Sequence, residues 1–178
     1  MDATPFIRRR LAGLLYAITV VVFVLDRITK VWVEQTLAGR PPIDVIPGVF
    51  QIRYTQNPGG AFGLFGGLPW LFLAATAIAA VAIVLASRNL SVRSAAVGLG
   101  LILGGALGNL TDRVARGPGL SGSVVDFLDF QIWPVFNVAD MGIVIGAGLV
   151  LLASAAKDRP DSAEARAETA AGEPVGGD

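Results

Sequence analysis

Four apolar stretches, each long enough to cross a lipid bilayer, constrain this chain more than any other feature of its sequence. They run from about Leu11 to Val33, Leu68 to Ala86, Ser94 to Thr111 and Val135 to Ala156. A helix needs roughly 20 mostly apolar residues to span the hydrocarbon core. Composition agrees, because 53% of the residues are apolar and only 16% are charged. Four buried helices of a soluble protein would need amphipathic partners, and no such helices are left in the chain. We therefore predict an all-α membrane protein with four transmembrane helices.

Basic residues predict the orientation of these spans. Arg8 to Arg10 precede the first span, Arg88 and Arg93 lie in the second connection, and Lys157 and Arg159 follow the fourth. By the positive-inside rule this side is cytoplasmic, so both termini lie inside and segments 34–67 and 112–134 lie outside. We expect residues 1–156 to form one transmembrane domain. The Ala-, Glu- and Gly-rich segment 157–178 is predicted to be a disordered cytoplasmic tail.

The first span is not expected to be a cleaved signal peptide. Its apolar run exceeds the usual hydrophobic region of such a peptide, and it contains Asp26 and Lys30 with no small-residue cleavage site after them. We expect it to remain in the mature protein.

The outer segment at about 34–67 shows the pattern of a small β-sheet. Apolar and polar residues alternate from Phe50 to Thr55, and Pro47-Gly48 precedes them as a turn signal. We predict a strand or hairpin over 43–55 that lies on the outer membrane surface. The Gly-rich segment 59–67 then returns the chain to the bilayer in a form that the sequence leaves ambiguous.

Small residues recur every four positions in the last two spans. Gly100, Gly104 and Gly108 follow this spacing in the third, and Gly142 and Gly146 in the fourth. Such glycines let helix backbones approach closely in lipid. We predict that the third and fourth spans are neighbours.

Missing residue types exclude several chemistries. The chain has no cysteine and no histidine. Thiolate catalysis, disulfides, a Ser-His-Asp triad and a His-ligated zinc are therefore excluded. Hydrolytic chemistry would have to use carboxylates, lysine or hydroxyls, and we predict neither a metal nor a cofactor. The net charge of zero gives no sign of a nucleic-acid partner.

Costly polar residues gather near the outer ends of the spans, which indicates one polar pocket facing outward. They are Asp26, Arg27, Thr29 and Lys30, then Asn57, then Asn109, Asp112 and Arg113, then Asp126 and Asp129, and finally Asn137 and Asp140.

Two carboxylates that share one proton could activate water in such a pocket. Asp112 precedes Arg113, which would hold it ionised, whereas Asp126 has apolar neighbours that can raise a carboxyl pKa. Asp140 opens the fourth helix, where Asn137 could orient it. The residues favour Asp126 with Asp140, and a pair that includes Asp112 stays open. Asp129 is expected to be a solvated loop residue.

Five strings in this chain resemble the bacterial lipoprotein signal peptidase (signal peptidase II) family. They are DRITK (26–30), TQNPGGAF (55–62), GGALGNLTDR (104–113), VVDF (124–127) and FNVAD (136–140). They occur in the family's order, over roughly residues 11–156. Two departures flank the pocket: Arg27 stands where Gln is usual, and Pro58-Gly59-Gly60 where a plainer Gly-Ala run is common.

The resemblance implies an aspartyl endopeptidase of the bacterial inner (cytoplasmic) membrane, with its active site at the outer face. It would cut the signal peptide from diacylglyceryl-modified prolipoproteins, on the N-terminal side of the lipidated cysteine. It also implies contact with membrane lipid and inhibition by a cyclic peptide antibiotic such as globomycin. A monomer suffices for this mechanism. The catalytic pair would be Asp126 and Asp140, surrounded by motif residues that bind substrate or support the site: Asp26, Lys30, Asn57, Asn109, Asp112, Arg113 and Asn137.

Several supporting residues have two interpretations. Asp26 and Lys30 could form only a helix-face ion pair. Asn57, before Pro58, could simply make a turn. Asn109 and Asn137 are expected to brace the aspartates rather than to touch substrate. Arg113 could bridge Asp112 or grip substrate.

Trp32, Trp70 and Trp133 are expected to form an aromatic belt rather than a ligand-stacking site.

Two alternatives apply to the chain as a whole. A small transporter could use the same polar cluster as a binding site, but the costly groups lie at one end only. Another type of intramembrane aspartyl protease is disfavoured because no GxGD string is present.

Overall fold

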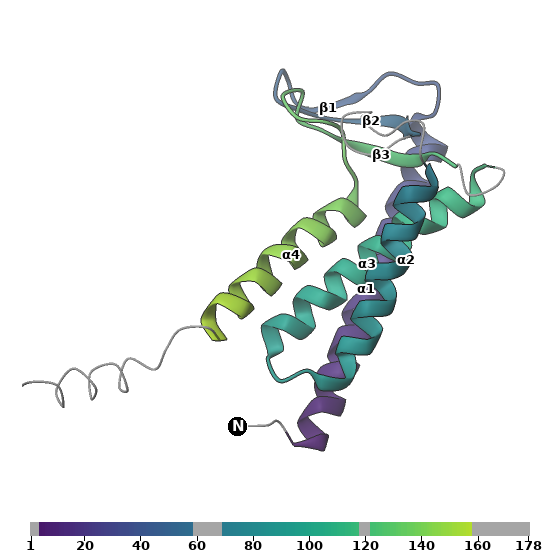
Figure 1. The fold of residues 1–178 in the computed structure, drawn as a ribbon. Coiled ribbons are helices and arrows are strands. Elements are labelled where there is room, and N and C mark those ends of the chain that lie inside the picture. Colours follow the sequence, from purple (N-terminus) through teal and green to yellow (C-terminus); the bar gives the residue numbers. More distant parts are fainter. Residues whose placement is uncertain (1–3, 59–68, 118–121, 158–178) are drawn as a thin grey trace, which may run out of the picture.

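The computed structural model describes residues 4–58, 69–117 and 122–157, which form helices beneath a small sheet (Figure 1). The helices are α1 (Pro5–Leu37), α2 (Pro69–Ala86), the short 3-10 helix η2 (Ser87–Asn89), α3 (Arg93–Ala115) and α4 (Val138–Lys157). The strands are β1 (Ile43–Ile46), β2 (Phe50–Asn57) and β3 (Val124–Asp129). Two parts of the chain for which we made predictions lie outside the described residues: segment 59–67 and nearly all of the tail 157–178.

Each predicted span coincides with a helix, although the boundaries differ. By length and composition α1, α3 and residues 138–155 of α4 can each cross a membrane. The 18-residue α2 is about 27 Å long, close to the thickness of the hydrocarbon core. Large apolar side chains point away from the protein along these helices, and Ile78, Val144 and Leu151 are each 70% exposed. The fold is therefore that of a helical membrane protein.

Helix α3 is the central helix of the bundle, since it packs against α4, α1 and α2. Its neighbour relation with α4 was predicted, but the glycines divide differently from the prediction. An added Cβ at Gly98 would lie 2.7 Å from the Gly146 carbonyl oxygen of α4. The stripe at Gly100 and Gly104 instead faces α1, where an added Cβ would lie 2.6 Å from the Leu15 oxygen and 2.7 Å from the Thr19 oxygen, respectively. Small residues thus let α3 approach both neighbours closely.

The predicted hairpin is present at the outer end of the bundle. β1 pairs with β2 in antiparallel fashion, and Gly48 in the turn between them adopts the left-handed region (φ 74°). A third strand, β3, pairs antiparallel with β2, so the sheet order is β1-β2-β3. We did not predict β3 from the sequence, because its residues, VVDFLD, lack the regular apolar–polar alternation of β2. Phe127 of β3 packs on Val33 and Leu37 of α1, which fastens the sheet to the helices.

Candidate active site

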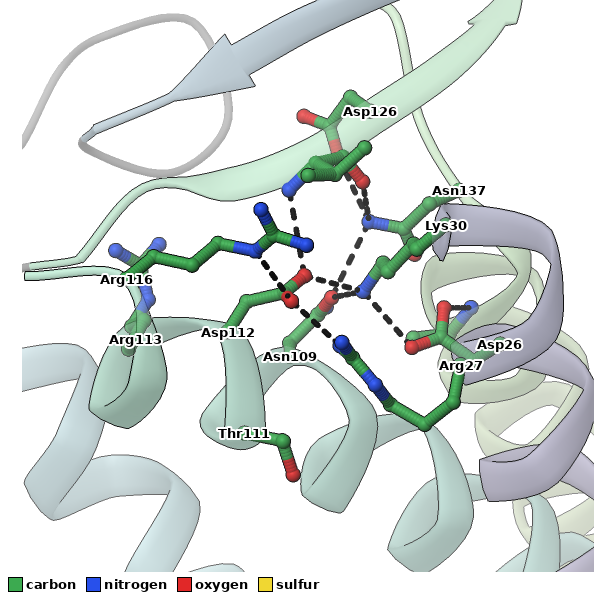
Figure 2. Close-up of polar contacts among 12 residues, drawn as sticks. Asp26, Arg27, Lys30, Asn109, Thr111, Asp112, Arg113, Arg116, Asp126 and Asn137 are labelled. Atoms are coloured by element: carbon green, nitrogen blue, oxygen red, sulfur yellow. Dashed lines mark hydrogen bonds and ion pairs between the residues drawn. The ribbon is translucent and has the colours of Figure 1, made fainter. Parts of the chain in front are cut away.

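Side chains from helices and sheet converge where the sheet meets the bundle (Figure 2). The structure brings all nine predicted site residues to this junction. Asp26 and Lys30 come from α1, Asn57 from the end of β2, Asn109, Asp112 and Arg113 from α3, Asp126 from β3, and Asn137 and Asp140 from the start of α4.

Backbone pairing between Leu128 and Phe136 sets the local geometry of the site. The Leu128 N–H donates to the Phe136 oxygen at 2.8 Å, and the Phe136 N–H donates to the Leu128 oxygen at 3.1 Å. The chain therefore doubles back after β3, through a turn in which Gln131 has a positive φ of 61°. This return places Asn137 against β3, directly before α4 begins.

Asn137 links the two aspartates. Its Nδ2 donates to Asp126 Oδ1 at 2.6 Å, and its backbone N–H donates to Asp140 Oδ2 at 3.3 Å. The Asp140 N–H in turn donates to Asn137 Oδ1 at 3.0 Å. This reciprocal pair between the residue before a helix and its third residue has the form of a capping box. The same contacts that begin α4 thus fix Asp140 relative to Asp126.

Two further amides hold the carboxylates. Asn57 Nδ2 donates to Asp126 Oδ2 at 3.0 Å, and Asn109 Nδ2 donates to Asp140 Oδ1 at 2.8 Å. Asn57 therefore does more than make a turn before Pro58. Asn109 and Asn137 contact both carboxylates between them, as expected for residues that brace the aspartates. Whether either also touches substrate stays a prediction.

Asp126 is only 2% exposed. Burial raises the pKa of its carboxyl, and the nearby negative charge of Asp140 raises it further. These effects outweigh the hydrogen bonds from Asn57 and Asn137, so the pKa of Asp126 is about 6. Asp126 therefore keeps a proton to a higher pH than an ordinary aspartate.

Asp112 is the centre of a buried ion network rather than a partner of Arg113 alone. Its carboxylate lies 2.5 Å from Arg27 Nη1, 3.0 Å from Lys30 Nζ and 2.9 Å from Arg116 Nε. Arg116 also makes a two-pronged ion pair with Glu34 of α1, at 2.5 and 2.8 Å. Neither Arg116 nor Glu34 was predicted from the sequence, although Arg116 follows Asp112 by four residues, a spacing at which side chains on one helix can pair.

The network also reaches the strand that carries Asp126. The Val125 N–H donates to Asp112 Oδ2 at 3.3 Å, so Asp112 anchors β3 one residue before Asp126. The Nη1 of Arg113 donates to the Gly122 oxygen at 3.4 Å, and this side chain also lines the cavity described below. Arg27, at the position that departs from the family pattern, is part of this support.

Lys30 connects the network to the aspartates. The predicted pair with Asp26 is present at 2.9 Å, and both side chains are fully buried. Lys30 Nζ also donates to Asn109 Oδ1 at 2.9 Å. Asp26 Oδ1 accepts the Ala139 N–H of α4 at 3.0 Å. These contacts give Asp26 and Lys30 a supporting position behind Asn109 and Asp140.

Asp129 is not the solvated loop residue that we expected. It ends β3, is 4% exposed, and its Oδ2 lies 2.7 Å from both Gln51 Nε2 and Arg53 Nε of β2. Burial alone would raise the pKa of Asp129, but these contacts and the Gln131 N–H lower it. Its carboxylate therefore joins two strands.

A cavity of about 510 Å³ lies beside the two aspartates. Asn57, Asn109, Arg113, Asp126 and Asp140 form its polar end. Its remaining walls are mostly apolar and come from α2, α3, β3, α4 and the segment before α4: Ala75, Thr76, Ala79, Ile102, Ala106, Val124, Trp133, Pro134, Val135, Phe136, Ile143 and Val144.

One wall of this cavity continues onto the outer surface of the bundle. Val144 is 70% exposed, so the cavity adjoins the surface that faces lipid. Trp133 is 64% exposed and Trp32 is 47% exposed, while the side chain of Trp70 lies outside the description. The aromatic belt stays a prediction, and Trp133 also lines the cavity.

The comparisons with known proteins agree on one family. A family model described as signal peptidase (SPase) II matches residues 18–156. The lipoprotein signal peptidase of Desulfitobacterium hafniense is 42% identical over 79% of this chain and 92% of its own length. Those of Rhodococcus jostii and Mycobacterium bovis are 41% and 46% identical over 86% and 82% of this chain, and 77% and 72% of their own lengths.

Solved structures show the same similarity in three dimensions. A bacterial membrane enzyme 30% identical to this chain superposes with a TM-score of 0.71, over 90% of this chain and 98% of its own. A second bacterial membrane enzyme, 33% identical, gives a TM-score of 0.68 over 79% of this chain and 92% of its own.

Proposed function

Because this chain belongs to the signal peptidase II family, we propose that it removes signal peptides from lipoprotein precursors, using Asp126 and Asp140 as its catalytic pair. The observation that carries the assignment is that Asn137 hydrogen-bonds to both carboxylates at the wall of one cavity. Asp112 is a weaker candidate, since three cations already surround its carboxylate.

The two aspartates take different roles in this proposal. Asp126, whose pKa is about 6, holds the shared proton and acts as the acid. Asp140 lies in the first turn of α4, where the helix dipole favours a negative charge, and acts as the base. A water molecule between them would lie within reach of both carboxylates.

Hydrolysis then proceeds in two steps, in which each proton that is taken up is later given back. Asp140 takes a proton from water, the water oxygen bonds to the scissile carbonyl carbon, and Asp126 donates its proton to the carbonyl oxygen. In the second step the carbon–nitrogen bond breaks, and Asp140 gives its proton to the leaving amine. The proton on the former carbonyl oxygen returns to Asp126. Both side chains end in the state in which they began.

The shape of the cavity supports a substrate that is partly in lipid. The polar end holds the aspartates, while Ala79, Ile102 and Val144 belong to apolar walls from three different helices. We propose that the substrate carries a diacylglyceryl cysteine whose acyl chains stay among these apolar side chains. The scissile bond, on the N-terminal side of that cysteine, would then reach Asp126 and Asp140.

The direct test is cleavage of a lipidated precursor by purified protein in detergent. The wild type should cut it, whereas Asp126→Asn and Asp140→Asn should remain folded and lose at least a thousandfold in rate, because each removes one member of the pair. Asp44→Asn, an exposed carboxyl on β1, is the matched control. Full activity in either site variant would refute the assignment, and transport without cleavage would favour a carrier.

Two added arms test the substrate and the inhibitor. A precursor whose cysteine lacks the diacylglyceryl group should be cut at least tenfold more slowly, because its apolar contacts are lost. Globomycin should block cleavage of the lipidated precursor. Equal rates on both precursors would contradict the proposed substrate class.

We also propose that the protein resides in the bacterial inner membrane, with both termini in the cytoplasm and the sheet outside. Since the chain has no cysteine, single cysteines can report on this orientation. A membrane-impermeant thiol reagent applied to intact spheroplasts should label Asp44→Cys on β1 but not Ser91→Cys before α3. The reverse pattern would show the opposite orientation.

A further inference from the structure

One hydroxyl lies among the apolar walls of the cavity beside the two aspartates. It belongs to Thr76 of α2, and the other residues of α2 on this wall are the small Ala75 and Ala79. Apart from the indole of Trp133, Thr76 has the only polar side chain among the described residues of these walls. The mechanism proposed above gives this hydroxyl no part, so its position needs a separate explanation.

The cavity extends from the aspartates along the helices, toward the middle of the membrane. On α3 it is lined by Asn109, Ala106 and Ile102, which span about 10 Å along the helix at 1.5 Å per residue. Helices α2 and α4 both pack on α3, and side chains of both line the cavity. Its apolar part is therefore a groove between α2 and α4 with α3 as its floor, and Thr76 belongs to the α2 side.

The Thr76 hydroxyl differs from other threonine hydroxyls in this bundle. Those of Thr19 and Thr111 donate to the carbonyl oxygens of Leu15 and Leu107, one turn earlier in their helices, at 3.0 and 2.7 Å. Within residues 4–58, 69–117 and 122–157, no group accepts a hydrogen bond from Thr76. A hydroxyl without a partner is unfavourable among apolar side chains. The cavity therefore favours a ligand that brings an acceptor to this wall.

The substrate of the proposed function offers two kinds of carbonyl oxygen. Peptide carbonyls of a helical signal segment already accept hydrogen bonds from the segment's own N–H groups, as lipid requires. The ester carbonyls of a diacylglyceryl group accept hydrogen bonds, but this group has no donor of its own. These esters also stand between the thioether, next to the scissile bond, and the acyl chains. They would therefore lie between the aspartates and the apolar walls.

We propose that the Thr76 hydroxyl donates a hydrogen bond to an ester carbonyl of the diacylglyceryl group. The inference rests on the proposed function and adds a specificity-determining residue to it. Thr76 exchanges no proton with the reacting atoms, and its bond to the ester is the same before and during hydrolysis. Loss of the hydroxyl should therefore raise KM and leave kcat unchanged.

Cleavage of two synthetic precursors by the full chain in detergent tests the proposal. Both carry the same peptide, one with a diacylglyceryl cysteine and one with a dialkylglyceryl cysteine, which keeps the chains but lacks the carbonyl oxygens. The test variants are Thr76→Val, which removes the hydroxyl at nearly constant shape, and Thr76→Ser, which keeps it. The matched control is Thr111→Val on α3, outside the cavity lining and drawn away from the dashed contacts in Figure 2. Melting transitions establish that each variant folds.

A neutral hydrogen bond contributes about fivefold to binding, so the wild type should cut the diacyl precursor about fivefold better in kcat/KM than the dialkyl one. Thr76→Val should lose this preference through KM, and its kcat/KM for the dialkyl precursor should stay within about twofold of the wild type. Thr76→Ser and Thr111→Val should keep the preference. A preference that survives in Thr76→Val, or an equal loss on both precursors, would overturn the proposal.

Binding without cleavage separates this contact from the peptidase function. In the Asp126→Asn background, native mass spectrometry should show that adding Thr76→Val weakens binding of the diacyl peptide about fivefold and leaves binding of the dialkyl peptide unchanged. If the wild type cuts neither precursor but this difference is present, the peptidase function is wrong and the ester contact stands. If cleavage is normal and the difference is absent, the ester contact is wrong.

Discussion

Replacing Asp126 with asparagine should stabilise the protein at high pH while it abolishes cleavage. In the folded protein the pKa of Asp126 rises from 3.8 to about 6, first because the carboxyl is buried and second because Asp140 is near. The favourable contribution of the neutral carboxyl is fully present below pH 3.8 and is lost as the pH rises through about 6. Asparagine does not titrate, so the variant does not suffer this loss.

The structure sets the magnitude of the effect. At about 1.4 kcal/mol per pKa unit, the ionised carboxylate destabilises the folded state by about 3 kcal/mol at pH 8. Asparagine has one acceptor oxygen, so it cannot accept hydrogen bonds from both Asn57 and Asn137 through separate oxygens. That loss costs about 1 kcal/mol at every pH. The net gain is therefore about 2 kcal/mol at pH 8, and it disappears near pH 4.

Thermal unfolding followed by tryptophan fluorescence, at one heating rate in one detergent, measures this difference. A gain of about 2 kcal/mol raises Tm by roughly 4–8 °C for a chain of this size. The control Asp44→Asn removes an exposed carboxyl and should give no comparable pH-dependent gain. An Asp126→Asn difference that is the same at pH 4 and pH 8, or larger at pH 4, would refute the reasoning.

Three further substitutions test the supporting structure. Gly108→Ala should destabilise the protein by about 1–3 kcal/mol and reduce activity, because a Cβ there collides with the Asp26 carboxylate. The control Gly148→Ala, where nothing lies within 4 Å of an added Cβ, should have little effect on unfolding. Equal effects of the two variants would refute this packing. Asn137→Ala should cost about 1–3 kcal/mol of stability and lower kcat at least tenfold, because it removes the cap of α4 and the hydrogen bond to Asp126. An unchanged kcat in a cleavage assay would contradict this. Arg116→Ala should lower Tm by several degrees because it breaks the partly buried ion pairs between α3 and α1, and an unchanged melting curve would show that they add nothing.

Much of the architecture could be predicted from the sequence because its physical causes are local. Long apolar runs predict membrane helices whatever their neighbours are, and the alternation from Phe50 to Thr55 predicted β2 correctly. The meeting of so many polar residues also followed from a local cost, since each is unfavourable in lipid by itself. The structure places Asp126 and Asp140 beside one cavity, and their catalytic role stays a prediction.

What could not be predicted depends on long-range pairing. β3 looks like any short apolar segment until its partner β2 is known, and Asp129 therefore looked like a loop residue. Arg116 and Glu34 are far apart in the chain, and only the packing of α3 on α1 brings them together. The glycine stripe had the right meaning, but helix periodicity alone does not say which neighbour each glycine faces.

The backbone bridge between Leu128 and Phe136 makes the two candidate catalytic carboxylates neighbours within one short hairpin-like stretch. Bilayers of different thickness change the tilt of transmembrane helices. A change in the tilt of α1, which carries Asp26 and Lys30, would not lengthen the short connection between the two acids. The spacing of the two candidate acids is therefore set by this backbone pairing and by the cap of α4, both of which lie within residues 124–140.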